Sequence, residues 1–443
     1  MAGRVQLETV GPQDAFFTDD PEYTYFIKNF KKHSNFSPFY VDLDVTGEVE
    51  FGSIIKCTVP QNQGDLLKSV SLKVELSAID QSLISSLHAN TTGIGYNESI
   101  GHAMIEYAEL IIGGEIIQRI PSDFFSIYSE NYVTQTKQHN LEKLVGKPPL
   151  EFSGTPVMKT VIGHYNGNAL TDKKYFIDIP FYFYNNPELA IPVYAIKHQE
   201  IEVSIKFRNV EDCIHSIRSD IPYVDYVMYT GLKPKKLIKS AKITLEMVSL
   251  TNHEKEENLQ KDYIITQVQE NVFNINKNTN NDPVSYVFDL NFVNPVKELF
   301  FLIQGKRKSV NGYFTTSFDY DNSSRDLNSE YITYEQLKSL ELKLDDSEIL
   351  NEKTGSIINL RAVQSGIHHT RTQLFRRYYS YSFALEPERW YPTGQRNFSL
   401  VKNQTLKVNL NSEQETDREL RVLAHSYNIL RVENGIAKTL FNV

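Results

Sequence analysis

Residues 200–207 read EIEVSIKF, so that apolar and polar side chains alternate along the whole stretch. Successive side chains of a strand point to opposite faces, and a period of two is therefore typical of a strand with one face on a core. The same alternation recurs in four further stretches: 71–76 (SLKVEL), 242–247 (KITLEM), 339–344 (SLELKL) and 405–410 (TLKVNL). This pattern predicts a chain that is mainly antiparallel β-structure.

Helical patterns are scarce by comparison. The best candidate is the stretch 122–145, where Phe124, Tyr128 and Tyr132 recur every fourth residue and Ser122 stands at a position that favours an N-cap. We therefore expect an all-β fold with short helices in the connecting loops.

The composition excludes several protein classes. The chain has 443 residues, of which 40% are hydrophobic and 23% charged, as in folded globular proteins. Its net charge of −9 argues against a dedicated nucleic-acid coat, so we expect no direct nucleic-acid binding. The two cysteines, Cys57 and Cys213, are too few for a disulfide scaffold or a four-cysteine zinc site.

The alternating stretches fall into two regions, 40–208 and 241–435, separated by a segment with prolines and a basic run. We predict two consecutive antiparallel sandwiches without a residue-level repeat. The predicted parts are an N-terminal arm (1–24), a first jelly roll (25–210), a linker (211–240) and a second jelly roll (241–443), with loops at 80–97, 276–282 and 319–330.

The sequence shows no targeting signal. The first residues lack an apolar core flanked by basic residues, so we expect no secretory signal peptide and synthesis in a cytosol-like compartment. The longest apolar runs, such as 299–303 (LFFLI), are far shorter than the roughly 20 residues that cross a bilayer.

One acidic loop partly matches a calcium-binding spacing. Asp319, Asp321, Ser323 and Glu330 occupy positions 1, 3, 5 and 12, but Ser324 replaces the glycine required at position 6. A solvated acidic loop is the better interpretation.

Other candidate sites are equally weak. His368 and His369 are adjacent, and in a strand they would point to opposite faces and could not chelate one ion. Gly113 and Gly114 interrupt an apolar run as a hairpin turn does, and Cys57 lies in an alternating strand as a buried structural thiol. We therefore predict no catalytic, cofactor-binding or metal-binding residues.

Two surface features leave alternatives open. Glycosylation sequons begin at Asn35, Asn90, Asn97, Asn322, Asn397 and Asn403, and modification of the loop pair Asn90 and Asn97 is a weak hypothesis. The cluster Lys28, Lys31, Lys32 and His33 is either a solvated face, which we prefer, or a contact with lipid headgroups.

Ordered blocks along the first half resemble a known protein family. These blocks are GPQD (11–14), PEYTYF (21–26), KHSNF (32–36), GDLL (64–67), ELIIGGEII (109–117), IPFYF (179–183) and NPELAIP (186–192). They resemble the major capsid proteins of nucleocytoplasmic large DNA viruses, of the iridovirus and phycodnavirus type.

The second half resembles the same family. Its blocks are FVNPVKEL (292–299), YSFALEPE (381–388), PTG (392–394), NFS (397–399) and AHSYNILR (424–431). Departures lie mainly at 250–285 and 305–375. In the block 381–388, we expect residues 381–385 to form a strand that turns Phe383 or Leu385 toward a core. Glu386 and Pro387 should end this strand.

The resemblance implies a function without catalysis. Members have two consecutive jelly rolls per chain, and three chains form a pseudo-hexagonal capsomer that tiles an icosahedral shell over an internal membrane. It implies a homotrimer that contacts neighbouring capsomers, penton proteins and minor capsid proteins, in a virion capsid assembled in the host cytoplasm.

Two rival functions fit a pair of sandwiches. One is a glycan-acting amidase, which requires carboxylates that converge in a cleft. The other is a carbohydrate-binding surface protein, for which Trp390 beside Tyr391 would supply an aromatic platform.

Overall fold

The structure is a computed structural model of the chain. It describes residues 2–9, 11–27, 32–79, 91–97, 99–147, 171–218, 227–228, 236–257, 262–276, 284–305, 323–325, 331–333, 337–371, 378–411 and 418–441. No helix among them combines the length and the apolar composition that crossing a bilayer requires.

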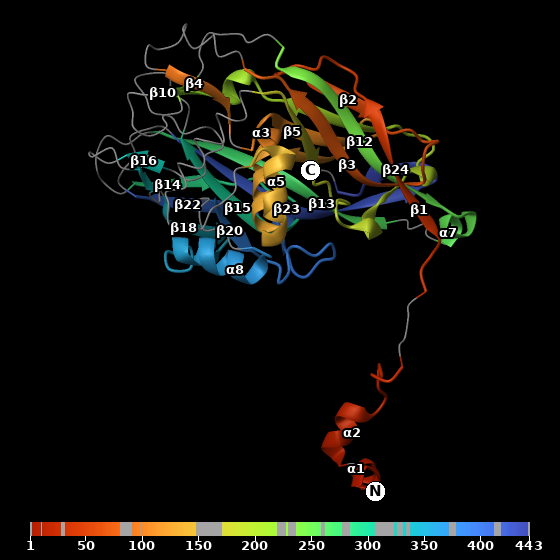
Figure 1. The fold of residues 1–443 in the computed structure, drawn as a ribbon. Coiled ribbons are helices and arrows are strands. Elements are labelled where there is room, and N and C mark those ends of the chain that lie inside the picture. Colours follow the sequence, from red (N-terminus) through yellow and green to blue (C-terminus); the bar gives the residue numbers. More distant parts are fainter. Residues whose placement is uncertain are drawn as a thin grey trace.

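The main strands of the first half form two antiparallel sheets (Figure 1). One has the order β1-β12-β3-β7 and the other the order β2-β9-β5-β6. Their bounds are β1 (Phe36–Asp44), β2 (Ile54–Thr58), β3 (Leu66–Leu76), β5 (Ile105–Ile112), β6 (Glu115–Pro121), β7 (Lys173–Asp178), β9 (Ile201–Phe207) and β12 (Ile238–Leu250). We call this part the first unit.

The second unit repeats that arrangement, with sheets β13-β23-β15-β20 and β14-β22-β18-β19. Its strands are β13 (Asp262–Ile275), β14 (Val284–Asp289), β15 (Pro295–Gly305), β18 (Leu337–Leu344), β19 (Ser347–Leu350), β20 (Tyr378–Ser382), β22 (Gln404–Leu410) and β23 (Arg418–Glu433). Counting the main strands of each unit along the chain, both units join them as 1-8-3-6 and 2-7-4-5. This is the two-sheet architecture of a jelly roll, so the predicted fold is confirmed.

The predicted boundary between the two units needs correction. Strand β12 pairs with β1 and with β3, and is therefore the last strand of the first unit, although the sequence prediction placed residues from 241 onward in the second. The predicted linker 211–240 also contains strand β10 (Ile214–Arg218), which pairs with β4 (Thr91–Tyr96). Alternation identifies a strand, but it carries no information on which sheet that strand joins.

Short elements fill the connections. The helices are α1 (Ala2–Glu8), α2 (Pro12–Thr18), α3 (Ile100–Ala103), α4 (Ser122–Asn131), α5 (Gln135–Val145), α7 (Asn252–Glu257), η2 (Pro187–Leu189), η3 (Val193–Ala195), η4 (Val210–Asp212), η5 (Ile358–Val363), α8 (Gln364–His368) and η6 (Phe398–Leu400). The minor strands are β8 (Ile191–Pro192), β11 (Val227–Met228), β16 (Ser323–Arg325), β17 (Tyr331–Thr333), β21 (Arg396–Asn397) and β24 (Ile436–Thr439). Strands β4 and β16 therefore lie within segments predicted as loops.

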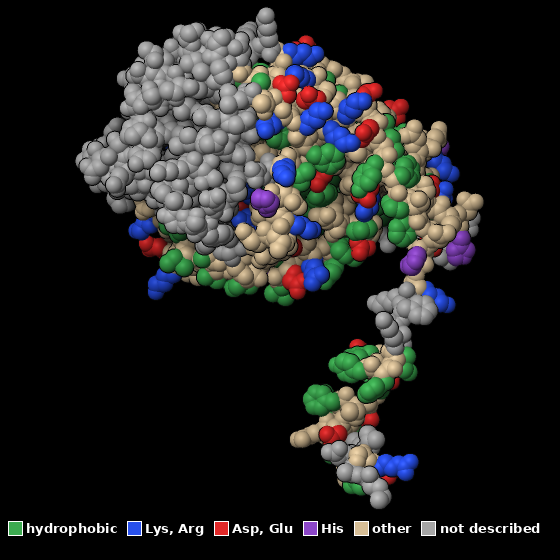
Figure 2. Space-filling view, in the orientation of Figure 1, with side chains coloured by type: hydrophobic (Ala, Val, Ile, Leu, Met, Phe, Trp, Pro, Cys, Tyr) green, Lys and Arg blue, Asp and Glu red, His purple; other side chains and the backbone are tan. Residues whose placement is uncertain are grey.

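The N-terminal arm runs away from both units (Figure 1). Its helices α1 and α2 carry exposed apolar side chains, among them Phe16 and Phe17. Figure 2 shows hydrophobic side chains in green along the arm. Within the described residues, the arm therefore adds nothing to the cores.

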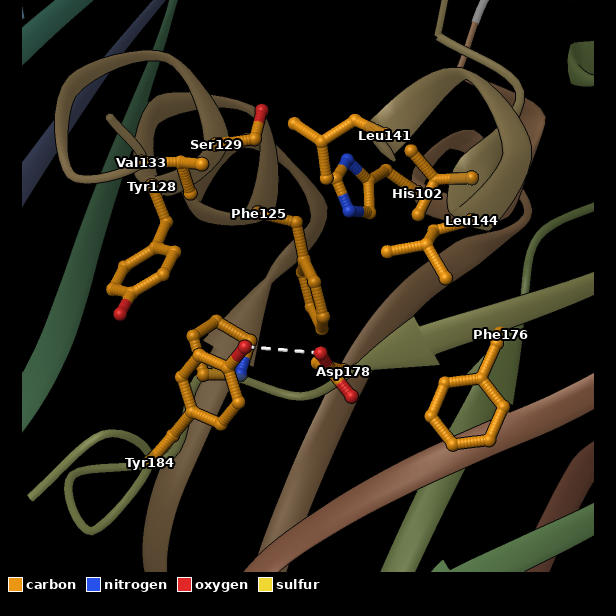
Figure 3. A pocket seen from close by; sticks show the side chains of 12 residues that line it. His102, Phe125, Tyr128, Ser129, Val133, Leu141, Leu144, Phe176, Asp178 and Tyr184 are labelled. Carbon is orange, nitrogen blue, oxygen red and sulfur yellow. Dashed lines mark hydrogen bonds between the residues drawn. The ribbon is translucent and has the colours of Figure 1, made fainter. Parts of the chain in front are cut away.

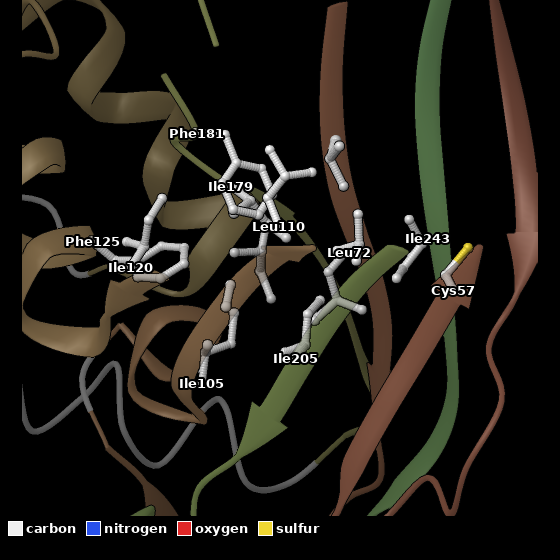
Figure 4. Close-up of a cluster of buried hydrophobic side chains, with 14 of the residues drawn as sticks. Cys57, Leu72, Ile105, Leu110, Ile120, Phe125, Ile179, Phe181, Ile205 and Ile243 are labelled. Carbon is white, nitrogen blue, oxygen red and sulfur yellow. The ribbon is translucent and has the colours of Figure 1, made fainter. Parts of the chain in front are cut away.

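The first unit has a continuous apolar core between its two sheets, to which Cys57, Leu72 and Ile205 contribute (Figure 4). The second unit has a core of its own that contains Leu299 and Phe301. Their neighbours in β15, Phe300 and Leu302, point to the other face of the sheet and join the core of the first unit. The sheet β13-β23-β15-β20 is thus covered on both faces, which explains the apolar run at 299–303.

The predicted hairpin turn is confirmed. Strands β5 and β6 pair antiparallel, and the turn between them holds Gly113 at φ +59° and Gly114 at φ +84°. Two consecutive residues with positive φ are the signature of a tight hairpin turn that favours glycine.

Candidate functional site

Helix α4 lies at the junction of the two units. Its residues Phe124 and Ile127 are buried, and the ring of Phe124 meets that of His425 from β23 edge-on at 5.1 Å. Pro121 is the N-cap residue and Ser122 is the first helical residue, so the predicted cap was wrong. The helix predicted over 122–145 is two helices, α4 and α5.

Glu298 of β15 is the centre of a buried polar network at this junction, and its side chain has no exposed surface. Tyr132, just after α4, donates its hydroxyl to Glu298 Oε1, and His425 Nδ1 lies 2.9 Å from the same oxygen. His369 Nε2 lies 3.3 Å from Oε2. Burial raises the pKa of the Glu298 carboxyl, but the two imidazoles outweigh burial and hold this pKa well below its usual range.

The two histidines carry different charges. Burial lowers the pKa of His369, but Glu298 and Glu388 face both of its ring nitrogens, the latter at 3.5 Å, and raise the pKa to about 9. His369 is therefore an imidazolium. Burial and the charge of Lys297 lower the pKa of His425 to about 4, so this ring is neutral and its Nδ1–H donates to Glu298.

The charges of the network cancel. Burial lowers the pKa of Lys297 to about 8, which leaves it mostly protonated at pH 7, and its Nζ donates to the carbonyl oxygen of Pro387 at 2.7 Å. The two carboxylates Glu298 and Glu388 are thus matched in number by two cations, Lys297 and His369. A buried network without net charge holds groups in place because any displacement leaves a charge unpaired.

Further ion pairs tie α4 to the second unit. Glu130 accepts from Lys147 of its own unit and, at 2.8 Å, from Arg371 Nη1 of the second unit. At the start of the same helix, Asp123 pairs with Arg421 of β23. All these groups except Arg421 are nearly buried, so the junction is fixed at both ends of α4.

Among the described residues, this junction shows neither a metal-binding cluster nor a pocket with paired carboxylates. No group of three or more His, Cys, Asp or Glu among the described residues is arranged to hold a metal ion. A pocket of about 50 Å³ lies between α4, α5 and β7, with room for a few water molecules (Figure 3). Its one carboxylate, Asp178, accepts from Tyr184 at 2.9 Å and from Ser71 at 2.6 Å. The pocket thus lacks the paired carboxylates that the amidase hypothesis requires.

The structure separates the candidates that the sequence raised. Asp319, Asp321 and Glu330 lie outside the described residues, so the acidic loop stays a prediction. His368 ends helix α8 rather than lying in a strand, and only His369 enters the network. Cys57 is buried, as predicted, and burial raises the pKa of its thiol to about 11.

The ring geometry gives no support to the proposed aromatic platform. Trp390 and Tyr391 meet edge-on at 88°, and Trp390 packs against the core of the first unit. A sugar-binding platform would present a flat exposed ring.

The structure describes only some of the residues named in the glycosylation and basic-cluster hypotheses. Asn97 is buried and donates to the carbonyl oxygen of Asp212 at 2.6 Å, so this sequon does not face solvent. Asn90, Asn322, Lys28 and Lys31 lie outside the described residues.

Sequence reasoning missed most of the network. Lys297 and Glu298 interrupt an otherwise apolar stretch, 296–303, and a charged pair in such a stretch is a signal of buried partners. Tyr132 and His425 carried no comparable signal.

Two family models cover nearly the whole chain. Residues 24–249 match the model described as "Major capsid protein N-terminus", and residues 254–438 match "Large eukaryotic DNA virus major capsid protein". The border between the matches falls at the end of β12, where the sheet also places it.

Curated relatives and solved structures agree with the models. The major capsid protein of Pyramimonas orientalis virus is 28% identical, with 98% of each chain covered, and that of Paramecium bursaria Chlorella virus 1 is 22% identical with the same coverage. The fold is similar to that of the Faustovirus major capsid protein, with a TM-score of 0.70 at 12% identity over 98% of this chain and 96% of that one.

The predicted resemblance is therefore confirmed by sequence and by fold. The chain belongs to the family of major capsid proteins of large eukaryotic DNA viruses, which makes it a structural component of a virion capsid and not an enzyme.

Proposed function

We propose that three copies of this chain associate into a capsomer with a nearly sixfold outline, and that these capsomers tile an icosahedral shell over an internal membrane. In this proposal the capsomers contact penton and minor capsid proteins and are assembled in the host cytoplasm. The arm comprises residues 1–24, and the boundary between the units follows Leu250.

The equal strand order of the two units carries this proposal. A chain with two similar units presents two similar sides, so three chains supply six similar sides around one axis. Such a ring is useful for tiling only if the units keep one relative orientation. The buried pairs of Glu298 with His369 and of Glu130 with Arg371 supply that rigidity within each chain.

Light scattering on the purified protein tests the proposal. The expected particle has three times the chain mass of 51.0 kDa and appears in electron micrographs with a hexagonal outline. Obligate assemblies of this kind bury more than about 2,000 Å², so the trimer should persist on dilution. A stable monomer at high protein concentration would contradict the proposal.

A further inference from the structure

The two units carry helices at the same place in their topology. Helix α4 directly follows β6, the fifth main strand of the first unit, and η5 with α8 follows β19, the fifth main strand of the second. Helix α4 is covered by the second unit within the same chain, through Phe124 and its ion pairs.

Among the described residues, no segment of the first unit covers the helix η5–α8 in this way. Ile358 is 74% exposed and Ile367 is 67% exposed, and Val363 between them is also exposed. The spacings of five and four residues, across a π-helical turn and an α-helical turn, place the three on one side of the helix. Figure 2 shows hydrophobic side chains along the rim of the molecule where Figure 1 places α8.

The sheet faces show the same difference. Near the start of β13, the outward-facing Tyr263 and Ile265 are 6% and 0% exposed because the first unit covers them. The corresponding positions in the first unit lie near the start of β1, where Phe36 is 52% exposed and Tyr40 is 71% exposed. Within the chain, α4 and the first unit cover the outer face of the sheet that contains β13. The helix η5–α8 and the outer face of the sheet that contains β1 are the matching pair of surfaces, and both are exposed.

We propose that η5–α8 of one copy packs on the outer face of the sheet β1-β12-β3-β7 of a second copy, against Phe36 and Tyr40. This inference rests on the proposed trimer and names its interface. It is a head-to-tail contact that repeats the internal one, and three internal and three external contacts then close a ring.

The charges on the receiving face are compatible with burial. Asp42 pairs with Lys73 at 2.8 Å and Lys68 pairs with Glu246 at 2.6 Å, both within the face. Covering the face therefore leaves no charge of these pairs without a partner, whereas an isolated buried charge would oppose association.

Charge insertion at the two surfaces tests the inference. We expect Ile367→Asp and Tyr40→Asp each to raise the dissociation constant of the trimer by about a hundredfold or more, because a carboxylate is buried without a partner. Both positions are exposed in the single chain, so circular dichroism and thermal unfolding should match the wild type. The matched control is Val287→Asp on β14, an exposed position at the opposite edge of the sheet from β19.

Cross-linking provides an independent readout. Cys57 and Cys213 are both buried, so an introduced surface cysteine is the accessible thiol. The Ile367→Cys and Tyr40→Cys chains are mixed, reassembled and treated with a short bismaleimide. The mixture should yield a covalent dimer, and neither chain alone should do so.

The outcomes separate this inference from the proposed function. A trimeric wild type with trimeric Ile367→Asp and no cross-link would overturn the interface and leave the capsomer standing. Cross-linking of the Ile367→Cys chain with itself would show a helix-to-helix contact and would also overturn the interface. A monomeric wild type would overturn the proposed function and the inference together.

Discussion

Strands β15 and β22 lie in the two sheets of the same unit and differ in how many of their faces are covered. Buried and half-buried residues alternate along β22, whereas every residue from Val296 to Ile303 in β15 is buried. The first unit covers the face of β15 that points away from the core of the second unit. An unbroken apolar run in an antiparallel strand therefore indicates a packing partner outside the strand's own sandwich.

The polar residues of the two strands differ in the same way. Lys407 of β22 pairs with Glu341 of β18 at 2.8 Å on a face that solvent reaches. Glu298 of β15 has no solvent contact and depends entirely on Tyr132, His369 and His425. A surface pair contributes about 0–1 kcal/mol, but breaking a buried one costs about 3–5 kcal/mol.

The largest effect is expected from a charge in the doubly covered strand. Phe300→Asp places a carboxylate between the two units without a partner, at a cost comparable to the total stability of a domain, about 5–15 kcal/mol. We expect no folded protein in the soluble fraction. Lys407→Asp in β22 is the matched control and should fold. A soluble Phe300→Asp chain with the wild-type circular dichroism spectrum would show that β15 is not covered on both faces.

The second largest effect is expected from removing the Glu298 carboxylate at the centre of the network. Glu298→Ala leaves Tyr132 without its acceptor and His369 without its counter-charge, and the free energy of unfolding is expected to fall by about 3–5 kcal/mol. Glu341→Ala, which breaks the surface pair in the other sheet, should lower it by at most about 1 kcal/mol. Urea unfolding of both variants measures the difference. Equal losses would contradict the comparison.

Acid should destabilise the junction through its neutral histidine. The pKa of His425 is about 4 in the folded chain against 6.5 as the reference, so the unfolded chain binds more protons between these values and stability falls as the pH drops through them. We expect a loss of about 2 kcal/mol at pH 5 relative to pH 7 from this group. His369, with a pKa of about 9, contributes fully below pH 6.5 and loses its contribution only as the pH rises through 9.

The variant His425→Asn isolates that contribution. Burial also lowers the pKa of His102, to about 3, so the wild type should lose stability in acid through both residues. Denaturant unfolding at pH 7 and pH 5 should show a smaller acid loss for the variant, by about 2 kcal/mol. An unchanged pH dependence would mean that folding does not lower the pKa of His425.

The smallest effect concerns a residue beyond the end of β20. The strand ends at Ser382, and Leu385 is 76% exposed, so the expectation that Leu385 faces a core was wrong. Leu385→Asp should change the free energy of unfolding by less than about 0.5 kcal/mol. Phe383→Ala should cost more, because Phe383 packs against the core of the second unit. Thermal unfolding compares the two, and a larger loss for Leu385→Asp would reverse the assignment.

Local pattern was enough to locate the strands. All five alternating stretches lie in strands, from β3 to β22, because side-chain period depends only on neighbours in the chain. The boundary at 241 was wrong because β12 alternates equally well whether it joins β1 or a later strand. The network escaped prediction because its members, residues 132, 298, 369 and 425, are far apart in sequence.

The sequence by itself determined a chain of antiparallel strands in two units, a family of structural capsid proteins, and the tight turn at Gly113 and Gly114. Only the tertiary structure decided that β12 closes the first unit, that α4 covers one sheet face and that Glu298 meets one charged and one neutral histidine. The physical reason is the distance along the sequence over which each interaction acts. Periodicity and turn preference act over a few residues, whereas the cover of a sheet face and the partner of a buried charge depend on segments that meet only after folding.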